Sequence, residues 1–272
     1  PIVGDALRAG LDVWSGLHTM LGDDHEFAAV ALASGATIRD LRRAPAGLDV
    51  ASGRVRDLNA TVVLTVGTDC NIGKMTAQLQ VQSSVRQLGH RVSFAATGQT
   101  GILVEGRGIT VDAVIADFIA GAAESLTIEA AADADIVLVE GQGSLLHPAY
   151  SGVTLGLMHG ALPHAMVLCA QPSRTTIHRN PWVHIPSLSD MIRLYEGAME
   201  SLRPSPVIAI ALNTFDLDER EARKAIVDLR SRIASGPLLP NEVATMGADL
   251  AEALHYVHER GIIHRDIKPA NV

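Results

Sequence analysis

The sequence predicts an α/β fold in which a parallel sheet is covered by helices on both faces. Five runs of apolar residues are nearly continuous and rich in valine, isoleucine, leucine and alanine, which is typical of strands buried on both faces. Segments with helical character separate the runs, so that each connection can cross back over the sheet to a parallel strand. The expected strands are residues 61–66, 91–96, 135–139, 165–170 and 207–212.

Residues 1–43 precede these strands and predict a partial Rossmann-like unit. Short strands are expected at 11–14 and 36–41, with a helical stretch between them. The chain opens with Pro1 rather than Met, so we expect the first part of this unit to be missing. No GxGxxG motif is present, and we predict no dinucleotide there. Residues 44–60, which contain proline and glycine, are expected to form a linker.

The first strand of the sheet leads into the most informative stretch of the chain, Val62 to Gln80. A β-branched run ends there in a glycine-bounded loop, and a lysine and a helical pattern follow at once. This is the layout of a phosphate-binding loop, in which backbone N–H groups and the helix dipole favour an anion. The two glycines allow close backbone approach, and the lysine adds positive charge. The expected phosphate-binding residues are Gly67, Thr68, Asp69, Cys70, Asn71, Ile72, Gly73, Lys74, Met75 and Thr76.

Two features of this loop depart from the usual pattern. Five residues separate its glycines instead of four, a spacing that resembles dethiobiotin synthetases and cobyrinate synthases. Met75 follows Lys74 where a Mg²⁺-binding hydroxyl is usual, and the next hydroxyl, Thr76, lies about 100° further round the helix. We therefore expect at most a weak metal site, formed by Thr76 and Glu140. An ordinary glycine-rich turn without a ligand is the alternative.

The ends of the other strands predict further site residues, because ligands of open α/β sheets bind at the carboxyl ends of the strands. Glu140 follows the third strand, where a buried carboxylate can take up a proton or hold Mg²⁺. We expect Glu140 to be the catalytic residue; a loop acid that caps a neighbouring helix is the alternative. The residues after it are expected to offer backbone amides to a substrate, and they are Gly141, Gln142, Gly143 and Ser144.

Two later strand ends carry weaker candidates. Arg174 can clamp a substrate carboxylate with paired hydrogen bonds, and Asn213 can pair with an adenine edge. A structural role is an equal alternative for each, and for Asn213 this is a turn in which its side chain bonds its own backbone. A helix is also expected after the second strand, where apolar residues recur at helical spacing at Val111, Val114, Ile115, Phe118 and Ile119.

Composition excludes several classes of partner. The formal net charge is −8 and no basic run is present, so neither nucleic acid nor an anionic membrane is an expected partner. We expect a small-molecule substrate, and a homo-oligomer is left open. The cysteines, Cys70 and Cys169, predict no disulfide framework and favour a reducing, cytoplasmic setting. Cys70 is expected to line the loop. The sequence has no HxxxH pair backed by an acid, so we expect no metal site at His147.

Residues 236–272 change in character and resemble the catalytic-loop region of protein kinases. They contain an HRDxKxxN signature, in which the aspartate accepts the substrate hydroxyl proton and the asparagine holds a metal. No DFG follows, and no glycine-rich nucleotide lid or VAIK-like strand precedes the signature, so we expect an inactive fragment. The kinase-like residues are His264, Arg265, Asp266, Lys268 and Asn271.

From about residue 11 to residue 233 the chain resembles the DgcN-type family. Four motifs carry the resemblance: GTDCNIGKMT at the loop, VEGQGSLLHP after the third strand, QPSR after the fourth and IALNT at the fifth. The resemblance implies a Rossmann-like N-terminal domain followed by a P-loop domain, which we expect at 61–235. It also implies an activity, the N-acetylation of D-glutamate with acetyl-CoA.

These observations lead to one hypothesis and two alternatives. Acetyl transfer from acetyl-CoA needs a hold on an ADP-like diphosphate but no obligatory Mg²⁺, which agrees with Met75. Glu140 would take a proton from the substrate amine, and backbone amides from Gly141 to Ser144 would stabilise the oxyanion. The first alternative is an ATP- and Mg²⁺-dependent ligase similar to dethiobiotin synthetase. The second is a truncated fusion without enzymatic activity.

Overall fold

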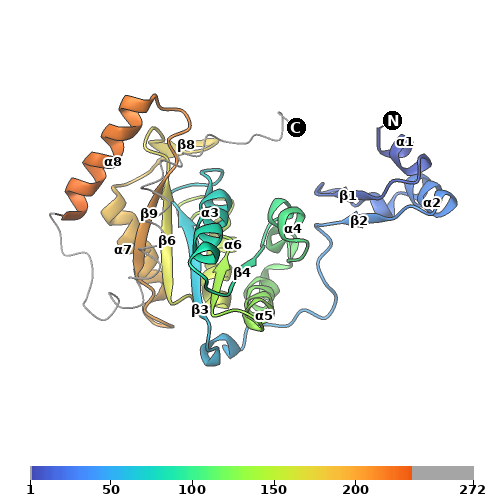
Figure 1. Cartoon of the computed structure of the whole chain (residues 1–272), viewed down its shortest axis with the longest axis horizontal. Coiled ribbons are helices and arrows are strands. Elements are labelled where there is room, and N and C mark those ends of the chain that lie inside the picture. Colours follow the sequence, from blue (N-terminus) through green and yellow to red (C-terminus); the bar gives the residue numbers. More distant parts are fainter. Residues whose placement is uncertain (1, 235–272) are drawn as a thin grey trace.

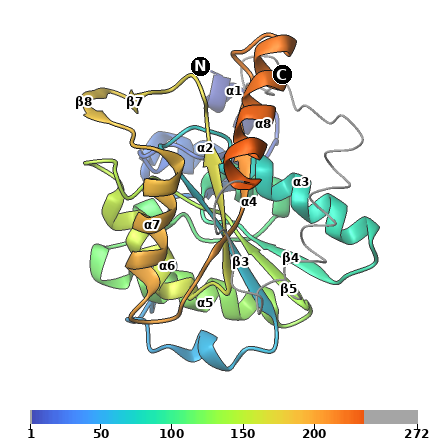
Figure 2. The ribbon, with the colours of Figure 1, turned by 90° about the vertical axis from the view of Figure 1, so that its left-hand side faces the viewer.

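The structure is a computed structural model that describes residues 2–234 (Figures 1 and 2). Its centre is a five-stranded sheet in the order β4-β5-β3-β6-β9, and all neighbouring strands in it run parallel. The predicted α/β fold with a parallel sheet is therefore confirmed. The kinase-like segment, residues 236–272, lies outside the described residues.

All five predicted strands form, and their ends differ from the prediction by no more than one residue. The central strand is β3 (Thr61–Gly67), which pairs with β5 (Ile136–Val139) on one side and β6 (Ala165–Ala170) on the other. The outer strands are β4 (Val92–Ala95) and β9 (Val207–Leu212). Because the strands are parallel, the carboxyl ends of β3, β5 and β6 lie side by side at one edge of the sheet.

Side chains of β3 alternate between two cores, since successive residues of a strand point to opposite faces. Val63 packs with α3 (Lys74–Gln87) on one face, and Val62 lies in the core of the other face. The described helices that pack on this second face are α5 (Ile119–Ala131), α6 (Ser151–Ala161) and α7 (Leu188–Met199). A further helix, α8 (Glu219–Ala234), follows β9. Among the described residues no helix is both long and apolar enough to cross a bilayer.

The segment after β4 differs from the predicted continuous helix. A short helix, α4 (Gln99–Glu105), comes first, and two 3₁₀-turns, η3 (Val111–Ala113) and η4 (Ala116–Phe118), precede α5. Between the turns, Val114 and Ile115 have extended backbone, and Ile115 is 70% exposed. Apolar residues three apart also fit the period of a 3₁₀-helix, so the pattern alone did not distinguish the two structures.

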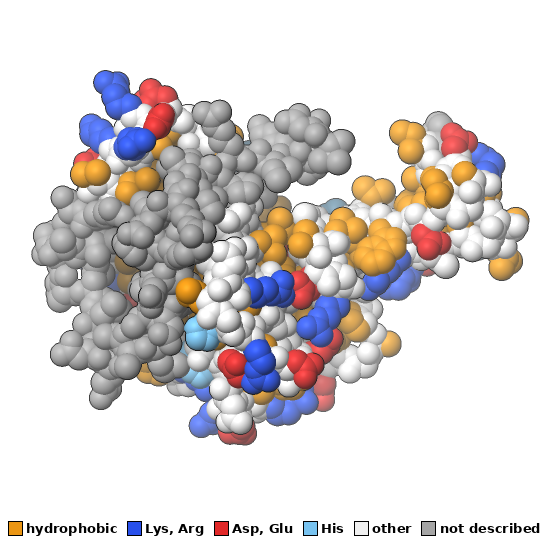
Figure 3. Space-filling view, viewed as in Figure 1, with side chains coloured by type: hydrophobic (Ala, Val, Ile, Leu, Met, Phe, Trp, Pro, Cys, Tyr) orange, Lys and Arg blue, Asp and Glu red, His pale blue; other side chains and the backbone are white. Residues whose placement is uncertain are grey.

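Residues 2–40 form a small separate lobe, on the right in Figures 1 and 3. Both predicted strands are present as a parallel pair. Asp24 caps the helix between them, because its carboxylate accepts hydrogen bonds from the N–H groups of Glu26 and Phe27. The elements of the lobe are α1 (Ile2–Arg8), β1 (Val13–Ser15), η1 (Leu21–Asp23), α2 (His25–Ser34) and β2 (Ile38–Asp40).

The end of this lobe is anchored to the sheet domain. Leu41 is buried in the core beneath α3, and the Thr110 hydroxyl donates to its carbonyl oxygen at 2.6 Å. Arg42 is only 8% exposed. Its Nε donates to the carbonyl oxygen of Gly16 at 2.8 Å, and its guanidinium forms an ion pair with Asp112. The N-terminal lobe and the sheet domain are thus joined by the buried Leu41 and by the contacts of Arg42.

The predicted linker is irregular, with one 3₁₀-turn, η2 (Arg54–Asp57), but it packs against α5. Glu124 of α5 is fully buried and accepts hydrogen bonds from the backbone N–H groups of Ser52 (3.0 Å) and Arg54 (2.7 Å). The side chains of both residues donate to it as well. Burial raises the pKa of Glu124, but these hydrogen bonds lower it by more, so that the pKa lies below its usual value.

Replacing Glu124 with alanine should destabilise the fold, because the linker would lose its buried acceptor. We expect the free energy of unfolding of Glu124→Ala to fall by about 3 kcal/mol, measured by guanidinium titration. The matched control is Glu129→Ala on the same helix, whose exposed carboxylate pairs with Arg107 at 3.7 Å. That variant should lose less than about 1 kcal/mol. Equal losses in the two variants would contradict this account of the linker.

Candidate functional site

The loop between β3 and α3 leaves a row of backbone donors without acceptors. Within residues 2–234, the N–H groups of the six consecutive residues Asn71 to Thr76 donate no hydrogen bond, and the helix begins its bonding when Ala77 donates to Gly73 (2.9 Å). Asn71 and Gly73 have positive φ angles of 51° and 93°, which turn the chain at this point. Such a row at a helix start is suited to bind an anion such as phosphate.

Lys74 is buried beneath this loop. Its Nζ donates to the carbonyl oxygen of Asp69 at 2.8 Å, and the residue is only 6% exposed. Burial lowers the pKa of Lys74, and the neighbouring thiol and carboxyl groups oppose that shift. Close packing favours glycine at position 67, because a Cβ there would lie 2.7 Å from the Ile72 side chain and 3.1 Å from the carbonyl oxygen of Asp69. The loop therefore packs tightly, and it covers the side chain of Lys74.

Asp69 fixes the loop from within. It is fully buried, and its carboxylate accepts hydrogen bonds from the N–H groups of Cys70 and His178, both at 2.7 Å. Arg174 completes the set at 3.0 Å and also donates to the carbonyl oxygen of Cys70. These contacts give Arg174 a role in holding the loop, and its predicted role as a substrate clamp stays a prediction. The antiparallel hairpin that supplies His178, β7 (Thr176–Ile177) and β8 (Asn180–His184), was not predicted.

The residues after the lysine show why this loop has an unusual metal position. Met75 is partly buried and packs against the core beneath α3. Thr76 makes no side-chain hydrogen bond in the described part of the chain. The hydroxyl position of an ordinary phosphate loop is thus filled by an apolar side chain. The weak metal site predicted at Thr76 and Glu140 stays a prediction.

Glu140 follows β5 and is buried at the carboxyl edge of the sheet. One oxygen, Oε2, accepts hydrogen bonds from the N–H groups of Thr97 (2.9 Å) and Gly98 (3.0 Å), and Thr97 is itself held by Val111, whose N–H donates to its carbonyl oxygen (3.0 Å). The other oxygen, Oε1, accepts none from residues 2–234. Burial raises the pKa of Glu140 to about 7, although the two hydrogen bonds and Lys74 oppose the shift. Such a carboxyl can exchange a proton near neutral pH.

Close packing around Glu140 depends on small neighbours. A Cβ on Gly101 would lie 2.4 Å from Oε2 of Glu140. On the other side, a Cβ on Gly141 would lie 1.7 Å from the carbonyl oxygen of Thr65. Glycine is therefore required at both positions, where backbone or a carboxylate approaches closely.

The segment after Glu140 corrects one part of the predicted oxyanion site. The N–H of Gly141 donates to the hydroxyl of Thr65 at 2.9 Å, so this amide is not free for a substrate. The N–H groups of Gln142, Gly143 and Ser144 have no acceptor among the described residues. Three successive amides thus remain as donors, and an oxyanion site formed by them stays a prediction.

Tyr195 of α7 joins the two loops of the site, and the sequence pattern had not identified it. The side chain is fully buried, and its hydroxyl donates to the carbonyl oxygen of Gly67 at 2.7 Å. The hydroxyl oxygen of Tyr195 in turn accepts a hydrogen bond from the N–H of Leu145 at 3.2 Å. Burial raises the pKa of Tyr195, so the hydroxyl keeps its proton. An aromatic residue within an apolar helical stripe gives no sequence signal for this role.

Asn213 makes hydrogen bonds with the chain through both atoms of its amide. Its Nδ2 donates to the carbonyl oxygen of Ile72 at 3.2 Å, which supports the phosphate loop. Its Oδ1 accepts the N–H of Phe215 at 3.1 Å, which forms the local turn named as the alternative. One amide N–H and one lone pair of Asn213 are thus engaged with the chain itself, and its contact with adenine stays a prediction.

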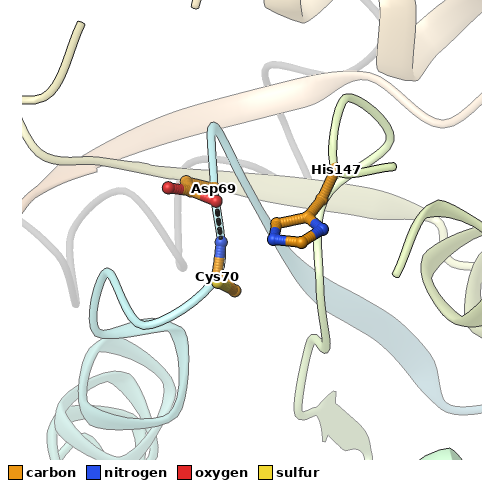
Figure 4. Close-up of side chains that lie close together, drawn as sticks. All are labelled: Asp69, Cys70 and His147. Carbon is orange, nitrogen blue, oxygen red and sulfur yellow. Dashed lines mark hydrogen bonds between the residues drawn. The ribbon is translucent and has the colours of Figure 1, made fainter. Parts of the chain in front are cut away.

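Cys70 and His147 come close together beside the loop, with Asp69 as the third member of the group (Figure 4). Ligand-type atoms of the three residues lie within 4.8 Å of one another. Burial, with a smaller contribution from Asp69, raises the pKa of the Cys70 thiol. This shift disfavours a reactive thiolate and agrees with Cys70 as a residue that lines the loop.

Two known proteins are similar to most of this chain. A D-glutamate N-acetyltransferase of Tritonibacter scottomollicae is 40% identical over 233 residues, which are 85% of this chain and 69% of the relative. The crystal structure of a DUF1611 family protein from Anabaena variabilis is 42% identical, with a TM-score of 0.82 over 93% of this chain and 74% of the other. The expected resemblance to D-glutamate N-acetyltransferases is thus confirmed.

A shorter similarity concerns protein kinases. A stretch of 37 residues is 49% identical to the serine/threonine-protein kinase PknB of Mycobacterium leprae, and it covers 14% of this chain and 6% of the kinase. This similarity is limited to one short segment and carries no kinase function to the rest of the chain.

Two family descriptions together span most of the sequence. A P-loop domain, described as a domain of unknown function (DUF1611_C), matches residues 49–246. A Rossmann-like domain, described as DUF1611_N, matches residues 1–44. The chain therefore belongs to the DUF1611 family, whose P-loop domain contains the loop between β3 and α3 and Glu140.

Proposed function

We propose that the chain binds the diphosphate of acetyl-CoA and transfers the acetyl group to the amine of an amino acid. The observation that carries this proposal is the row of six backbone N–H groups without acceptors, from Asn71 to Thr76, next to the buried Lys74. A diphosphate supplies several anionic oxygens for such donors. The similarity to a protein named D-glutamate N-acetyltransferase supports both the acetyl group and an amino-acid acceptor.

The phosphate loop favours a CoA-type diphosphate over ATP with Mg²⁺. Met75 packs into the core at the position where ATP-binding loops carry a hydroxyl for the metal. The ADP-like part of CoA has no γ-phosphate, so it has less need of a metal to balance its charge. Both ligands share the same backbone donors, which is why a direct comparison of their affinities tests this choice.

Glu140 is proposed as the general base. Acetyl-CoA supplies a thioester. The C–N bond of the amide forms as the C–S bond breaks, and CoA leaves as a thiolate that takes up a proton to become the free thiol. The amine loses one proton. Oε1 of Glu140 receives no hydrogen bond from the described residues and is free to take that proton. The pKa of about 7 suits this role, because a base works best when its pKa lies near the working pH.

The three amides after Gly141 are proposed to stabilise the oxyanion of the tetrahedral intermediate. The N–H groups of Gln142, Gly143 and Ser144 have no acceptor within residues 2–234, and they follow Glu140 directly in the chain. Donors that are already oriented stabilise developing negative charge without further rearrangement. Tyr195 would keep this segment in register with the phosphate loop through its contacts with Gly67 and Leu145.

We also propose a cytoplasmic setting and a small-molecule substrate. Cys70 and Cys169 are both free thiols, which agrees with a reducing compartment. Burial raises the pKa of Cys169 to about 12, so this thiol stays protonated and unreactive at neutral pH.

Replacing Lys74 with alanine should weaken ligand binding. We expect the dissociation constant for acetyl-CoA to rise about 10- to 100-fold, because a charged hydrogen bond to phosphate is lost, and isothermal titration calorimetry measures it. The control is Arg86→Ala, an exposed residue of the same helix, which should bind acetyl-CoA as the unaltered chain does. Unchanged binding by Lys74→Ala, or no binding by the unaltered chain, would refute the loop assignment. Tighter binding of ATP with Mg²⁺ than of acetyl-CoA would favour the ligase alternative.

Replacing Glu140 with glutamine should remove the proton acceptor without changing the shape of the site. We expect the rate of acetyl transfer to D-glutamate to fall about 10²- to 10⁴-fold. In the unaltered chain kcat/KM should rise with pH through about 7 and then level off, because only the carboxylate accepts a proton. Glu129→Gln, an exposed acid of α5, should keep the full rate. A pH profile without a step near 7 would exclude Glu140 as the base.

The same substitution should change the pH dependence of stability. The folded state holds the Glu140 proton more tightly than the unfolded chain does, so stability falls as pH rises from the ordinary value of 4.5 to about 7. The total loss is about 3 kcal/mol between pH of about 4.5 and 8. Glu140→Gln has no charge to bury, and guanidinium unfolding at the two pH values should show a smaller difference. An identical difference in both proteins would contradict the raised pKa.

A further inference from the structure

His147 is buried beside the phosphate loop and is held in one orientation. It is 4% exposed, and its ring centroid lies 4.3 Å from that of Tyr150. The backbone N–H of Ala149 donates to its Nδ1 at 3.2 Å. Because Nδ1 accepts a hydrogen bond, the neutral ring carries its proton on Nε2. His147 therefore presents a hydrogen-bond donor at the far end of its ring.

That donor is directed toward the loop. In Figure 4 the ring nitrogen farther from the side-chain attachment points toward Asp69 and Cys70. Nε2 makes no hydrogen bond with the described residues. The atom is not fully enclosed by protein, so a ligand can reach it. Asn71, which follows Cys70 in the chain, begins the row of free backbone N–H groups. The N–H of His147 thus lies open beside the anion-binding donors.

A metal ion is a poor occupant for this group, although its three residues offer ligand-type atoms within 4.8 Å. Metal binding at Nε2 would place a proton on Nδ1, where it would oppose the N–H of Ala149. The carboxylate of Asp69 already accepts hydrogen bonds from two backbone N–H groups and pairs with Arg174. Burial disfavours the thiolate of Cys70, which a metal requires. The hydrogen bonds therefore favour an anionic oxygen here over a cation.

We propose that His147 donates its Nε2–H to an anionic oxygen of the ligand held by Asn71 to Thr76. The phosphate site then has a side-chain donor in addition to its backbone donors and Lys74. This inference rests on the proposed function in one respect, which is that a phosphate-bearing molecule occupies the loop. It makes His147 a ligand-binding residue and leaves proton transfer to Glu140.

The test compares three substitutions that separate the two ring nitrogens. The amide nitrogen of glutamine reaches the place of Nε2, whereas that of asparagine reaches only the place of Nδ1. We therefore expect His147→Gln to bind CoA and inorganic pyrophosphate within about 3-fold of the unaltered chain. His147→Asn and His147→Ala should bind both about 10-fold or more weakly, because a charge-assisted hydrogen bond is lost. Unfolding midpoints identify any variant that has lost its fold.

The outcomes separate the inference from the proposed function. If Lys74→Ala loses affinity while His147→Asn and His147→Ala bind as the unaltered chain does, the function stands and the inference is wrong. If the unaltered chain binds neither CoA nor pyrophosphate, the proposed function itself fails. A Co²⁺ titration tests the cation directly. A thiolate-to-cobalt absorption band that is lost in Cys70→Ser would make the group a metal site and would overturn the inference.

Discussion

The buried carboxylate of Asp69 is the constraint on which the candidate site depends. It has no solvent contact, and it binds N–H groups from its own loop and from the β7–β8 hairpin. A buried charge of this kind is stable only when it is paired and fully hydrogen-bonded. Arg174 provides the pairing charge, so the hairpin and the loop must adopt their positions together. Cys70, the residue before the free amides that begin at Asn71, is held by its hydrogen bond to Asp69. This contact fixes where the row of amides begins.

The topology of the sheet brings the rest of the site to the same place. β3 lies between β5 and β6, so that the phosphate loop and Glu140 follow adjacent strands. Tyr195 then links them, since one hydroxyl bonds both Gly67 and Leu145. The loop proposed to bind an anion and the carboxylate proposed to accept a proton are therefore separate features that a shared core positions. Most of the proposed site consists of backbone groups, whose positions follow directly from the fold.

Much of the fold could be predicted, because parallel strands buried on both faces leave a clear apolar pattern in the sequence. All five central strands, the loop and Glu140 follow from local sequence. The rest depends on contacts between residues far apart in the chain. The turns at Val111–Phe118 are held by contacts such as Thr110 with Leu41, which overrode a helical spacing. Asn213 and Gly141 have their donors occupied by Ile72 and Thr65, and no local pattern contains that information.

The attachment of the N-terminal lobe is connected to the candidate site. Arg42 pairs with Asp112. The preceding residue, Val111, donates its N–H to the carbonyl oxygen of Thr97, and the N–H of Thr97 donates to Glu140. Four consecutive links thus connect the lobe to the proton acceptor, and none of them involves a long flexible loop. The contacts that hold the lobe and the hydrogen bonds that Glu140 accepts are therefore parts of one connected set.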